Sequence, residues 1–497
     1  MTRRTKIVCT LGPSSSDRET IAQLIGAGMD VARLNFSHGS HSGHAERITI
    51  IREEAARAGK VVPILQDLQG PKIRTGPVEN DMVLIRKGEQ LILTAEQMEV
   101  GTAEKIHVSY DSLAEEVKPG GRVLLDDGLL ELEIREVVGT DVITEVIVGG
   151  PLRSRKGVHL PLMHNSRPSL TQKDLDDLEF GISQDVDIIA LSFVRSETDV
   201  EAVVSRVREA GCRATVVAKI EKPEAVTRFD KILQVADGIM VARGDLGIEM
   251  PLSQVPITQK RIIKKCLQAA KPVITATQML ESMMDNPRPT RAEVSDVANA
   301  VLDGTDAVML SGETAAGKYP VQTVEVMARI IVETEKNYNL GKVDHYIRTA
   351  TSDSIVTDSV SFTAFELAEH VGAKAIVCLT ASGTTARSIA RHRPDIPVYA
   401  FTDDDHVVRQ LALLWGTKAF QIPFQKDTDS GVWTVHSRLR EEGLVEDGDL
   451  IVITAGMPLP TKGRTNMVHV SRIGAQLSAT SASESASESA SASESNA

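Results

Sequence analysis

The chain has 497 residues, of which 42% are hydrophobic and 25% charged, and its formal net charge is −13. This length corresponds to about three average domains, and the composition is that of a globular protein, which excludes disorder over the whole chain. The acidic balance makes nucleic acid and membranes poor partners, and no apolar stretch approaches the ~20 residues of a membrane span. The four cysteines form no CxxC pair and no secretory hydrophobic segment follows the start, so we expect a cytoplasmic protein without zinc or disulfides.

Short apolar segments, each followed by a stretch of helical character, recur over the first two thirds of the chain. Eight of them span residues 6–10, 30–36, 61–67, 186–192, 215–221, 238–245, 272–277 and 306–311. Continuous β-branched segments of this length are typical of strands buried on both faces. The alternation predicts an α/β fold, a (β/α)8 TIM barrel, with a doubly wound parallel sheet as the alternative.

The third and fourth segments lie too far apart for a single crossover. The residues between them are rich in Val, Ile, Leu and Thr and contain frequent glycine turns. This pattern predicts a small β-barrel inserted as a lid over residues 71–167. The catalytic barrel is then expected over residues 1–70 and 168–345.

A second α/β domain is expected over residues 346–477. Apolar segments at 375–380, 398–401 and 450–454 read as its strands. Residues 478–497 are almost entirely Ser, Ala and Glu and contain no large apolar side chain. We expect them to form a disordered tail, because such a segment cannot build a core.

Charged side chains follow the barrel segments, at the end of the strands where barrel enzymes carry their chemistry. Lys219 and Glu221 lie two residues apart, on one face of a strand, and Asp245 follows the next strand. Two carboxylates without nearby His or Cys suit a hard cation such as Mg²⁺. A lysine beside that metal requires an anion between them, so the combination favours phosphoryl transfer. A buried structural ion pair is the alternative.

Two other patterns are interpreted without a catalytic role. Residues 312–319 resemble a P-loop, but Tyr319 stands where Ser or Thr would bind Mg²⁺ and a proline follows at once. His38, His41 and His44 are flanked by Ser and Gly, and we interpret them as a solvated turn and helix start rather than a metal cluster.

Six motifs resemble those of the pyruvate kinase family, in the same order, within residues 5 to about 473. They are Arg33-Leu-Asn-Phe-Ser-His-Gly, Gly70-Pro-Lys-Ile-Arg-Thr, Ala218-Lys-Ile-Glu-Lys-Pro, Met240-Val-Ala-Arg-Gly-Asp-Leu-Gly, Ala276-Thr-Gln-Met-Leu-Glu-Ser-Met and Met309-Leu-Ser-Gly-Glu-Thr-Ala. The resemblance implies a barrel, an inserted lid and a C-terminal effector domain. It also implies phosphoryl transfer from phosphoenolpyruvate to ADP, giving pyruvate and ATP, with Mg²⁺ or Mn²⁺ as cofactor and a homotetrameric assembly.

The resemblance further implies residue roles. Lys219 stabilises the transferring phosphoryl group and the enolate, and Glu221 and Asp245 bind the divalent metal. The implied substrate-binding residues are Arg33, at the donor phosphate, with Lys219, Gly244, Asp245 and Thr277. The implied proton relay consists of Thr277 and Ser311, and the implied nucleotide-phosphate contacts are Arg74, His38 and Lys156.

One departure concerns the monovalent cation. Many family members bind K⁺ through matches of Asn35, Ser37, Asp67 and a Thr after that Asp, with a Glu in the hinge. Here Leu68 takes the place of the Thr and Lys72 that of the Glu. A fixed ammonium group substitutes for a monovalent cation and repels one close by, so we expect that K⁺ is not required.

In the C-terminal domain a strand is followed by a Gly/Ser/Thr loop and a helix. Such a loop offers N–H groups and hydroxyls to a phosphate, and an ordinary Ser/Thr helix cap is the alternative. The resemblance implies that an effector phosphate binds here, at Thr380, Ser382, Gly383, Thr384 and Thr385. Met457 replaces the Trp of members that bind fructose-1,6-bisphosphate, so AMP or a sugar monophosphate is at least as well supported as effector.

Two other functions compete with a kinase. One is a different barrel enzyme acting on phosphoenolpyruvate or pyruvate, such as an aldolase or a carboxyl-transfer enzyme. The large lid and the cations Arg74 and Lys156 favour the kinase over it. The other is a non-catalytic sensor of phosphorylated metabolites, and the intact set of charged residues at the barrel mouth argues against it.

Overall fold

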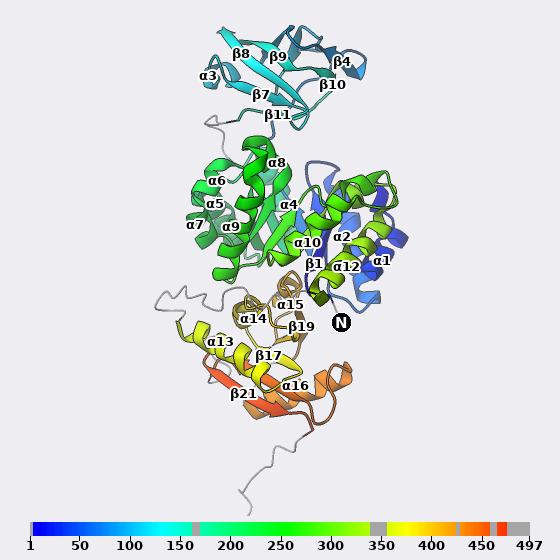
Figure 1. The fold of residues 1–497 in the computed structure, drawn as a ribbon, viewed down its shortest axis with the longest axis vertical. Coiled ribbons are helices and arrows are strands. Elements are labelled where there is room, and N and C mark those ends of the chain that lie inside the picture. Colours follow the sequence, from blue (N-terminus) through cyan, green and yellow to red (C-terminus); the bar gives the residue numbers. More distant parts are fainter. Residues whose placement is uncertain (1–2, 162–168, 338–354, 424–427, 458–464, 475–497) are drawn as a thin grey trace, which may run out of the picture. The chain divides into compact units, whose positions relative to one another are not determined.

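The computed structural model describes residues 3–161, 169–337, 355–423, 428–457 and 465–474, so the predicted tail lies outside the described part. The chain forms two compact units (Figure 1). One comprises residues 1–349 together with 390–395 and 405–419, and the other comprises 350–389, 396–404 and 420–497. In the described part of the chain no helix is long and apolar enough to cross a membrane.

The first unit contains a closed barrel of eight parallel strands, which confirms the predicted fold and excludes the doubly wound sheet. Each predicted segment contains one strand. They are β1 (Lys6–Leu11), β2 (Val31–Asn35), β3 (Ile64–Asp67), β12 (Ile188–Leu191), β13 (Thr215–Ile220), β14 (Gly238–Ala242), β15 (Val273–Ala276) and β16 (Ala307–Leu310). Their order around the barrel is β1-β16-β15-β14-β13-β12-β3-β2.

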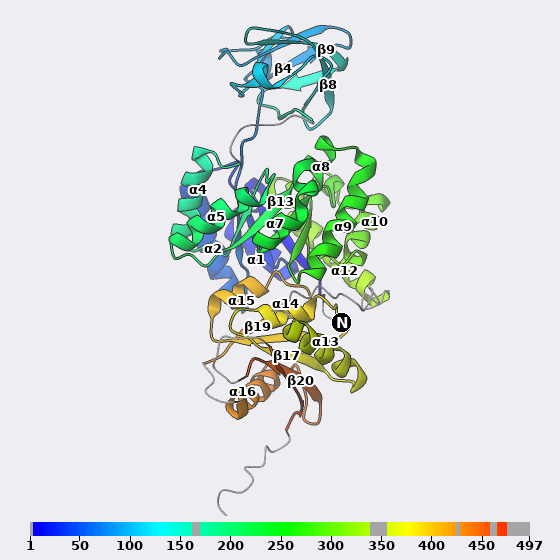
Figure 2. The same cartoon turned by 90° about the vertical axis from the view of Figure 1, so that its left-hand side faces the viewer.

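Helices surround the strands, as the two views at right angles show (Figures 1 and 2). They are α1 (Arg18–Ala27), α2 (His41–Arg57), α4 (Gln172–Ser183), α5 (Glu197–Glu209), α6 (Pro223–Thr227), α7 (Phe229–Val235), α8 (Arg243–Glu249), α9 (Val255–Gln268), α10 (Arg291–Leu302), α11 (Gly312–Ala315) and α12 (Pro320–Asn337). Helix α4 begins with a capping box in which Thr171 and Asp174 satisfy each other's backbone N–H groups.

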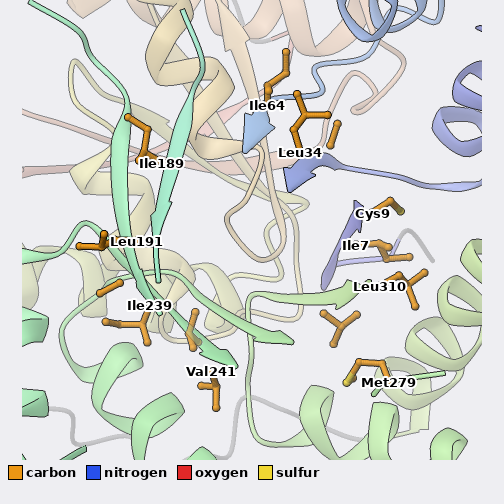
Figure 3. Packing of buried hydrophobic residues seen from close by; sticks show 14 of the residues in the cluster. Ile7, Cys9, Leu34, Ile64, Ile189, Leu191, Ile239, Val241, Met279 and Leu310 are labelled. Atoms are coloured by element: carbon orange, nitrogen blue, oxygen red, sulfur yellow. The ribbon is translucent and has the colours of Figure 1, made fainter. Parts of the chain in front are cut away.

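Alternate strand residues build two apolar layers, because neighbouring side chains of a strand point to opposite faces. Ile7 and Cys9 of β1 pack outward with helix residues such as Leu24, and Cys9 pairs in register with Leu310 of β16 (Figure 3). Val8, between them, belongs to the separate cluster that fills the barrel interior. The rigid barrel therefore fixes the directions in which the strand ends present their side chains.

The segment between β3 and β12 is rich in strands, as predicted. Its six-stranded sheet has the order β11-β7-β8-β9-β5-β6, and β4 and β10 form a second sheet. The elements are β4 (Met82–Ile85), β5 (Gln90–Thr94), β6 (Lys105–His107), α3 (Leu113–Glu116), β7 (Arg122–Leu125), β8 (Leu130–Val138), β9 (Asp141–Val148), β10 (Gly150–Arg153) and β11 (Val158–His159). Its apolar core is separate from that of the barrel.

A five-stranded sheet in the C-terminal part has the order β19-β18-β17-β20-β21. Its elements are α13 (Ile355–His370), β17 (Ala375–Leu379), α14 (Thr384–Ala390), β18 (Val398–Thr402), α15 (Asp405–Leu411), β19 (Thr417–Gln421), α16 (Thr428–Glu441), β20 (Leu450–Ala455) and β21 (Met467–Arg472). The sequence predicted the three central strands and missed both edge strands. Edge strands are only half buried, so they lack the continuous apolar segment that marks a central strand.

Candidate active site

Asp67, the last residue of β3, links two cations at the carboxyl end of the barrel. Its Oδ2 accepts a hydrogen bond from Arg33 Nε at 2.7 Å, and its Oδ1 lies 3.0 Å from Lys219 Nζ. Burial alone would raise the pKa of Asp67, but the charges of Lys219 and Arg33 outweigh it and hold the pKa below its usual value. Asp67 therefore stays ionised and fixes both cations.

Lys219, on β13, has three oxygen partners around its ammonium group. Besides Asp67, its Nζ lies 2.9 Å from Glu221 Oε1 and donates to Ser192 Oγ at 2.6 Å. Burial opposes the charged form, but Asp67 and Glu221 raise the pKa above its ordinary value. The barrel mouth thus contains a buried, permanent positive charge.

Glu221 lies at the end of the same strand and is 1% exposed. Its Oε2 accepts a hydrogen bond from the backbone N–H of Phe193 at 2.6 Å. Phe193 has a φ of 54°, a strained conformation for an aromatic residue that its surroundings must stabilise. Burial raises the pKa of Glu221, Lys219 lowers it and the negative charge of Asp245 raises it again, with a raised pKa as the result.

The two carboxylates fit a divalent metal. Within the described ranges no group of three His, Cys, Asp or Glu side chains could enclose an ion. Mg²⁺ needs no such cage, because it is commonly held by one or two carboxylates and completes its shell with waters and substrate phosphate. The charge of Asp245 acts on Glu221, and a cation bound by both would relieve that repulsion. Hard oxygen donors therefore match the predicted metal.

Thr277 follows β15 with a φ of 71°, a strained conformation for a β-branched residue. Its Oγ1 accepts the N–H of Gly244 at 2.7 Å and donates to the carbonyl of Ala276 at 2.6 Å. Arg243 donates through Nη2 to the Thr277 carbonyl at 2.6 Å, and its Nη1 is paired with Asp296 Oδ2 at 2.7 Å. The ends of β14 and β15 are thereby joined, and Gly244 and Thr277 are in direct contact.

Ser311 follows β16, the next strand. Its backbone N–H donates to Glu313 Oε2 at 2.7 Å, while Glu313 Oε1 accepts the N–H of Leu280 at 3.1 Å. Glu313 thus connects the segments after β15 and β16. The Oγ of Ser311 is buried and has no hydrogen-bond partner among the described residues, which leaves this hydroxyl available to a ligand or water.

Two of the predicted nucleotide contacts, His38 and Arg74, lie in one positively charged region. Burial lowers the pKa of His38, and the charges of Arg74, Lys72, Arg33 and Lys173 lower it further. Thr75, next to Arg74, donates its N–H to the carbonyl of Lys156 at 2.8 Å. The side chain of Lys156 is paired with Asp126 at 2.8 Å. Arg74 and His38 are thus close enough to interact, and Lys156 is joined to the segment of Arg74 through its backbone.

The residues predicted for the monovalent-cation pocket lie along β2 and β3. Asn35 and Asp67 are partners in register, and the Ser37 N–H donates to Asn35 Oδ1 at 3.1 Å. Leu68 is 1% exposed and offers no side-chain oxygen. Lys72 contributes to the positive field that lowers the pKa of His38.

The predicted effector loop lies between β17 and α14. Gly383 has a φ of 78°, and its N–H donates to Thr380 Oγ1 at 3.0 Å. The hydroxyls of Ser382 and Thr384 are 3.0 Å apart and exposed. Thr385 is buried instead, and its hydroxyl is 2.6 Å from that of Thr465.

Sequence reasoning missed several residues that hold the site together. Ser192 binds Lys219, Asp296 binds Arg243, and Thr10 Oγ1 accepts from Arg33 Nη1 at 2.7 Å. Their partners lie far away in sequence, so only the position of Ser192 after a strand could have indicated it. The interpretation of His44 as solvated is wrong, because it is 3% exposed and stacks on Phe36 at 4.1 Å.

An eight-stranded barrel with a buried lysine, paired carboxylates and clustered cations at the carboxyl ends of its strands defines a barrel enzyme of phosphoryl transfer. The sequence matches the pyruvate kinase barrel domain over residues 2–324 and the pyruvate kinase alpha/beta domain over residues 358–471. The chain belongs to the pyruvate kinase family, the phosphotransferases that convert phosphoenolpyruvate and ADP to pyruvate and ATP.

Individual relatives cover nearly the whole chain. It is 47% identical to a pyruvate kinase of Geobacillus stearothermophilus over 474 residues, 95% of this chain and 80% of that protein. It is 46% identical to one of Mycobacterium tuberculosis strain H37Rv over 475 residues, 95% of this chain and 99% of that protein. The crystal structure of a pyruvate kinase from Cryptosporidium parvum superimposes with a TM-score of 0.88 and 38% identity, covering 95% of this chain and 96% of that one.

Proposed function

We propose that Lys219 is the central catalytic cation of this barrel mouth. The supporting observation is its buried ammonium group, held between Asp67, Glu221 and Ser192 with its charge preserved. In the reaction the bond from phosphorus to the enol oxygen breaks and a bond to a terminal ADP oxygen forms. Negative charge develops on the enolate oxygen, and a fixed cation in a buried site stabilises it without reorganisation.

Arg33 is proposed to bind the donor phosphate. Its guanidinium is already oriented by Asp67 and Thr10, so little side-chain freedom is lost when substrate binds. Gly244 and Thr277, which are hydrogen-bonded to each other after strands β14 and β15, are proposed to bind the substrate carboxylate region. Asp245 adds its carboxylate to the substrate site through the metal.

Thr277 and Ser311 are proposed to deliver the proton that converts the enolate to pyruvate, through a water molecule. Thr277 Oγ1 already donates to a carbonyl, whereas Ser311 Oγ is buried without a partner in the described residues. The proton ends on the methylene carbon of the enolate, and the hydroxyls orient the water that carries it.

The proposed metal ligands are Glu221 and Asp245, whose oxygens fit Mg²⁺ or Mn²⁺. Once bound, the ion supplies charge neutralisation for the phosphoryl oxygens. Glu221 is kept in place by the N–H of Phe193 and by Lys219. The chain thus provides at least one carboxylate, that of Glu221, in a defined orientation.

Arg74, His38 and Lys156 are proposed to bind the phosphates of ADP. His38 lies in the field of Arg74, Lys72 and Arg33, which favours anions. Lys156 would exchange its ion pair with Asp126 for the nucleotide, and an ion pair that is partly exposed contributes little stability.

Activity is proposed to be independent of K⁺. Leu68 provides no ligand for the ion, and the charge of Lys72 acts at the same end of the barrel. Asn35, Ser37 and Asp67 then shape the site around this fixed cation rather than coordinating K⁺.

Further proposals concern regulation and assembly. We propose that AMP or a sugar phosphate binds to the loop that contains Thr380, Ser382, Gly383 and Thr384. Thr385 supports this loop through the contact of its buried hydroxyl with that of Thr465. We also propose that the barrel domain spans residues 1–70 and 168–345, the inserted domain 71–167 and the C-terminal domain 346–477. The protein is proposed to assemble as a homotetramer. A cytoplasmic location is proposed as well, and the four free cysteines are consistent with it.

The test is pyruvate formation from phosphoenolpyruvate, ADP and Mg²⁺, with K⁺ present or replaced by tetramethylammonium. We expect ADP-dependent turnover in both media at rates that agree within about twofold. Turnover only with K⁺ would refute the role of Lys72 and retain the kinase. Pyruvate formation without any need for ADP would instead support a different enzyme of phosphoenolpyruvate.

A further inference from the structure

The first two turns of α4 contact three segments of the barrel mouth. The Asp174 Oδ1 accepts the N–H of Gly70 at 2.9 Å, next to the start of the inserted domain. The carbonyl of Asp177 accepts from Gln66 Nε2 at 2.6 Å, on the residue before Asp67. The carboxylate of Asp177 is linked through Lys173 and His41 to the third segment, the loop of residues 36–40 between β2 and α2.

Asp177 is connected to that loop indirectly, through one donor at each end of the loop. Its Oδ1 lies 2.7 Å from His41 Nε2, at the first residue of α2. Its Oδ2 lies 2.5 Å from Lys173 Nζ, which also donates to the carbonyl of Phe36 at 2.7 Å. The carboxylate is 5% exposed, while the side chains of Lys173 and His41 are 49% and 45% exposed. These contacts are therefore half-buried, and the buried carboxylate makes them stronger than a fully exposed pair.

Helix α4 is a rigid support for these contacts. A Cβ on Gly181 would lie 2.0 Å from Gln66 Oε1, so the helix packs against β3 at a distance that only glycine allows. The ring of His41 stacks on Phe180 of the same helix at 4.3 Å. Both ends of the loop are therefore linked to a helix that packs closely against strand β3.

We propose that Asp177 is a positioning residue that fixes the 36–40 loop and thereby sets the affinity for ADP. The loop carries Ser37 and His38, and the inference rests on the proposed contact of His38 with the nucleotide phosphates. Phosphoenolpyruvate depends on Arg33 and Lys219 instead, which are held by Asp67 and not by Asp177. Loss of the Asp177 carboxylate charge should thus weaken one substrate selectively.

The test compares Asp177→Asn with Asp176→Asn, the same change at the neighbouring, exposed position of α4. Initial rates are measured as a function of ADP concentration at saturating phosphoenolpyruvate, and as a function of phosphoenolpyruvate concentration at saturating ADP. For Asp177→Asn we expect the KM for ADP to rise about tenfold, with the KM for phosphoenolpyruvate and kcat within about twofold of the parent. Asp176→Asn should leave all three unchanged.

Two additional variants separate this role from general stability and from the proposed nucleotide contact. Lys173→Met should raise the KM for ADP in the same way, and the double variant with Asp177→Asn should be no worse than the poorer single one, because both act through one contact chain. If Asp177→Asn fails to fold, Lys173→Met alone tests the inference through the same two KM values. His38→Ala reports the direct contact with ADP.

Equal increases in both KM values, or unchanged kinetics in a folded Asp177→Asn, would overturn the inference. Fully additive effects of Lys173→Met and Asp177→Asn would do so as well. If His38→Ala leaves the KM for ADP unchanged while Asp177→Asn raises it, the proposed nucleotide contact is wrong and the positioning role passes to other groups of the loop.

Discussion

The two ends of the barrel each contain a buried aspartate beside cations, yet the two clusters are built differently. At the amino-terminal end, Asp306 Oδ1 forms an ion pair with Arg393 Nη2 at 3.1 Å and accepts a hydrogen bond from the N–H of Trp415 at 3.1 Å. Its Oδ2 accepts the N–H of Val273 at 3.0 Å. Arg393, 2% exposed, also donates to the carbonyl of Gly304. This carboxylate is therefore fully used by donors of the chain itself.

At the carboxyl-terminal end the corresponding groups keep capacity for a ligand. Asp67 is shared by Arg33 and Lys219, but the hydroxyl of Ser311 has no partner in the described part. Thr277 is held at a positive φ, a strain typical of functional sites. The comparison teaches that a buried ion pair stabilises the fold at one end, whereas at the other it prepares charges for a substrate.

The largest effect is expected at the amino-terminal end. Asp306→Ala leaves Arg393 buried and without its partner, which should lower the free energy of unfolding by about 3–5 kcal/mol. Urea unfolding followed by circular dichroism measures it, together with turnover per folded molecule, which should be nearly unchanged. Asp285→Ala, which removes an exposed pair with Lys318, should not shift the midpoint. A stable but inactive Asp306→Ala enzyme would contradict the contrast between the two ends.

At the barrel mouth, Lys219→Met is expected to abolish most of the activity while the protein stays folded. Loss of the central cation should cost about 3 kcal/mol or more of transition-state stabilisation, at least about a hundredfold in kcat. Steady-state pyruvate release and a thermal melt measure activity and fold separately. Lys231→Met, on the exposed face of α7, is the control and should retain full activity. Near-normal turnover of a folded Lys219→Met variant would remove Lys219 from the mechanism.

The smallest effect concerns His44, beneath the 36–40 loop. Burial is the main cause that lowers its pKa, so the neutral form is favoured in the folded state. The unfolded chain binds the proton first as the pH falls below about 6.5, and stability should decrease there. Between pH 7 and 5 we expect a loss of about 1 kcal/mol, seen as a shift in the urea midpoint.

The matched variant for this prediction is His44→Phe, which keeps a ring on Phe36 but removes the titrating group. Its stability should change less with pH than that of the parent over the same range. Other histidines titrate in both proteins and cancel in the difference. Identical pH profiles of the two proteins would show that His44 does not contribute.

Much of the fold was predictable because local signals agree with it. All eight barrel strands are buried on both faces, so each left a continuous apolar segment in the sequence. The start of α4 also carries a local signal, because Thr171 and the acid three residues later form its capping box. The edge strands β19 and β21 lack this signal, since half of their residues face solvent.

The site was predictable where a residue lies in a motif at a strand end, as Lys219, Glu221 and Asp245 do. Residues that support it from elsewhere were missed. In the sequence, Asp177 is one of several acidic residues of a helix and nothing sets it apart. In the structure it is buried and contacts His41, which is 136 positions away in the chain. His44 was misjudged because its polar neighbours in sequence are not its neighbours in space.

The sequence by itself determined the barrel, the strand-rich insert and the types of charge at the strand ends, because these depend on periodicity and on residues close in the chain. Only the tertiary structure decided which acid meets which base: Asp67 with Arg33 and Lys219, Asp306 with Arg393, and Asp177 with His41. The physical reason is that each pair is closed by the packing of separate elements, and burial makes the partner obligatory, because an unpaired buried charge costs several kcal/mol.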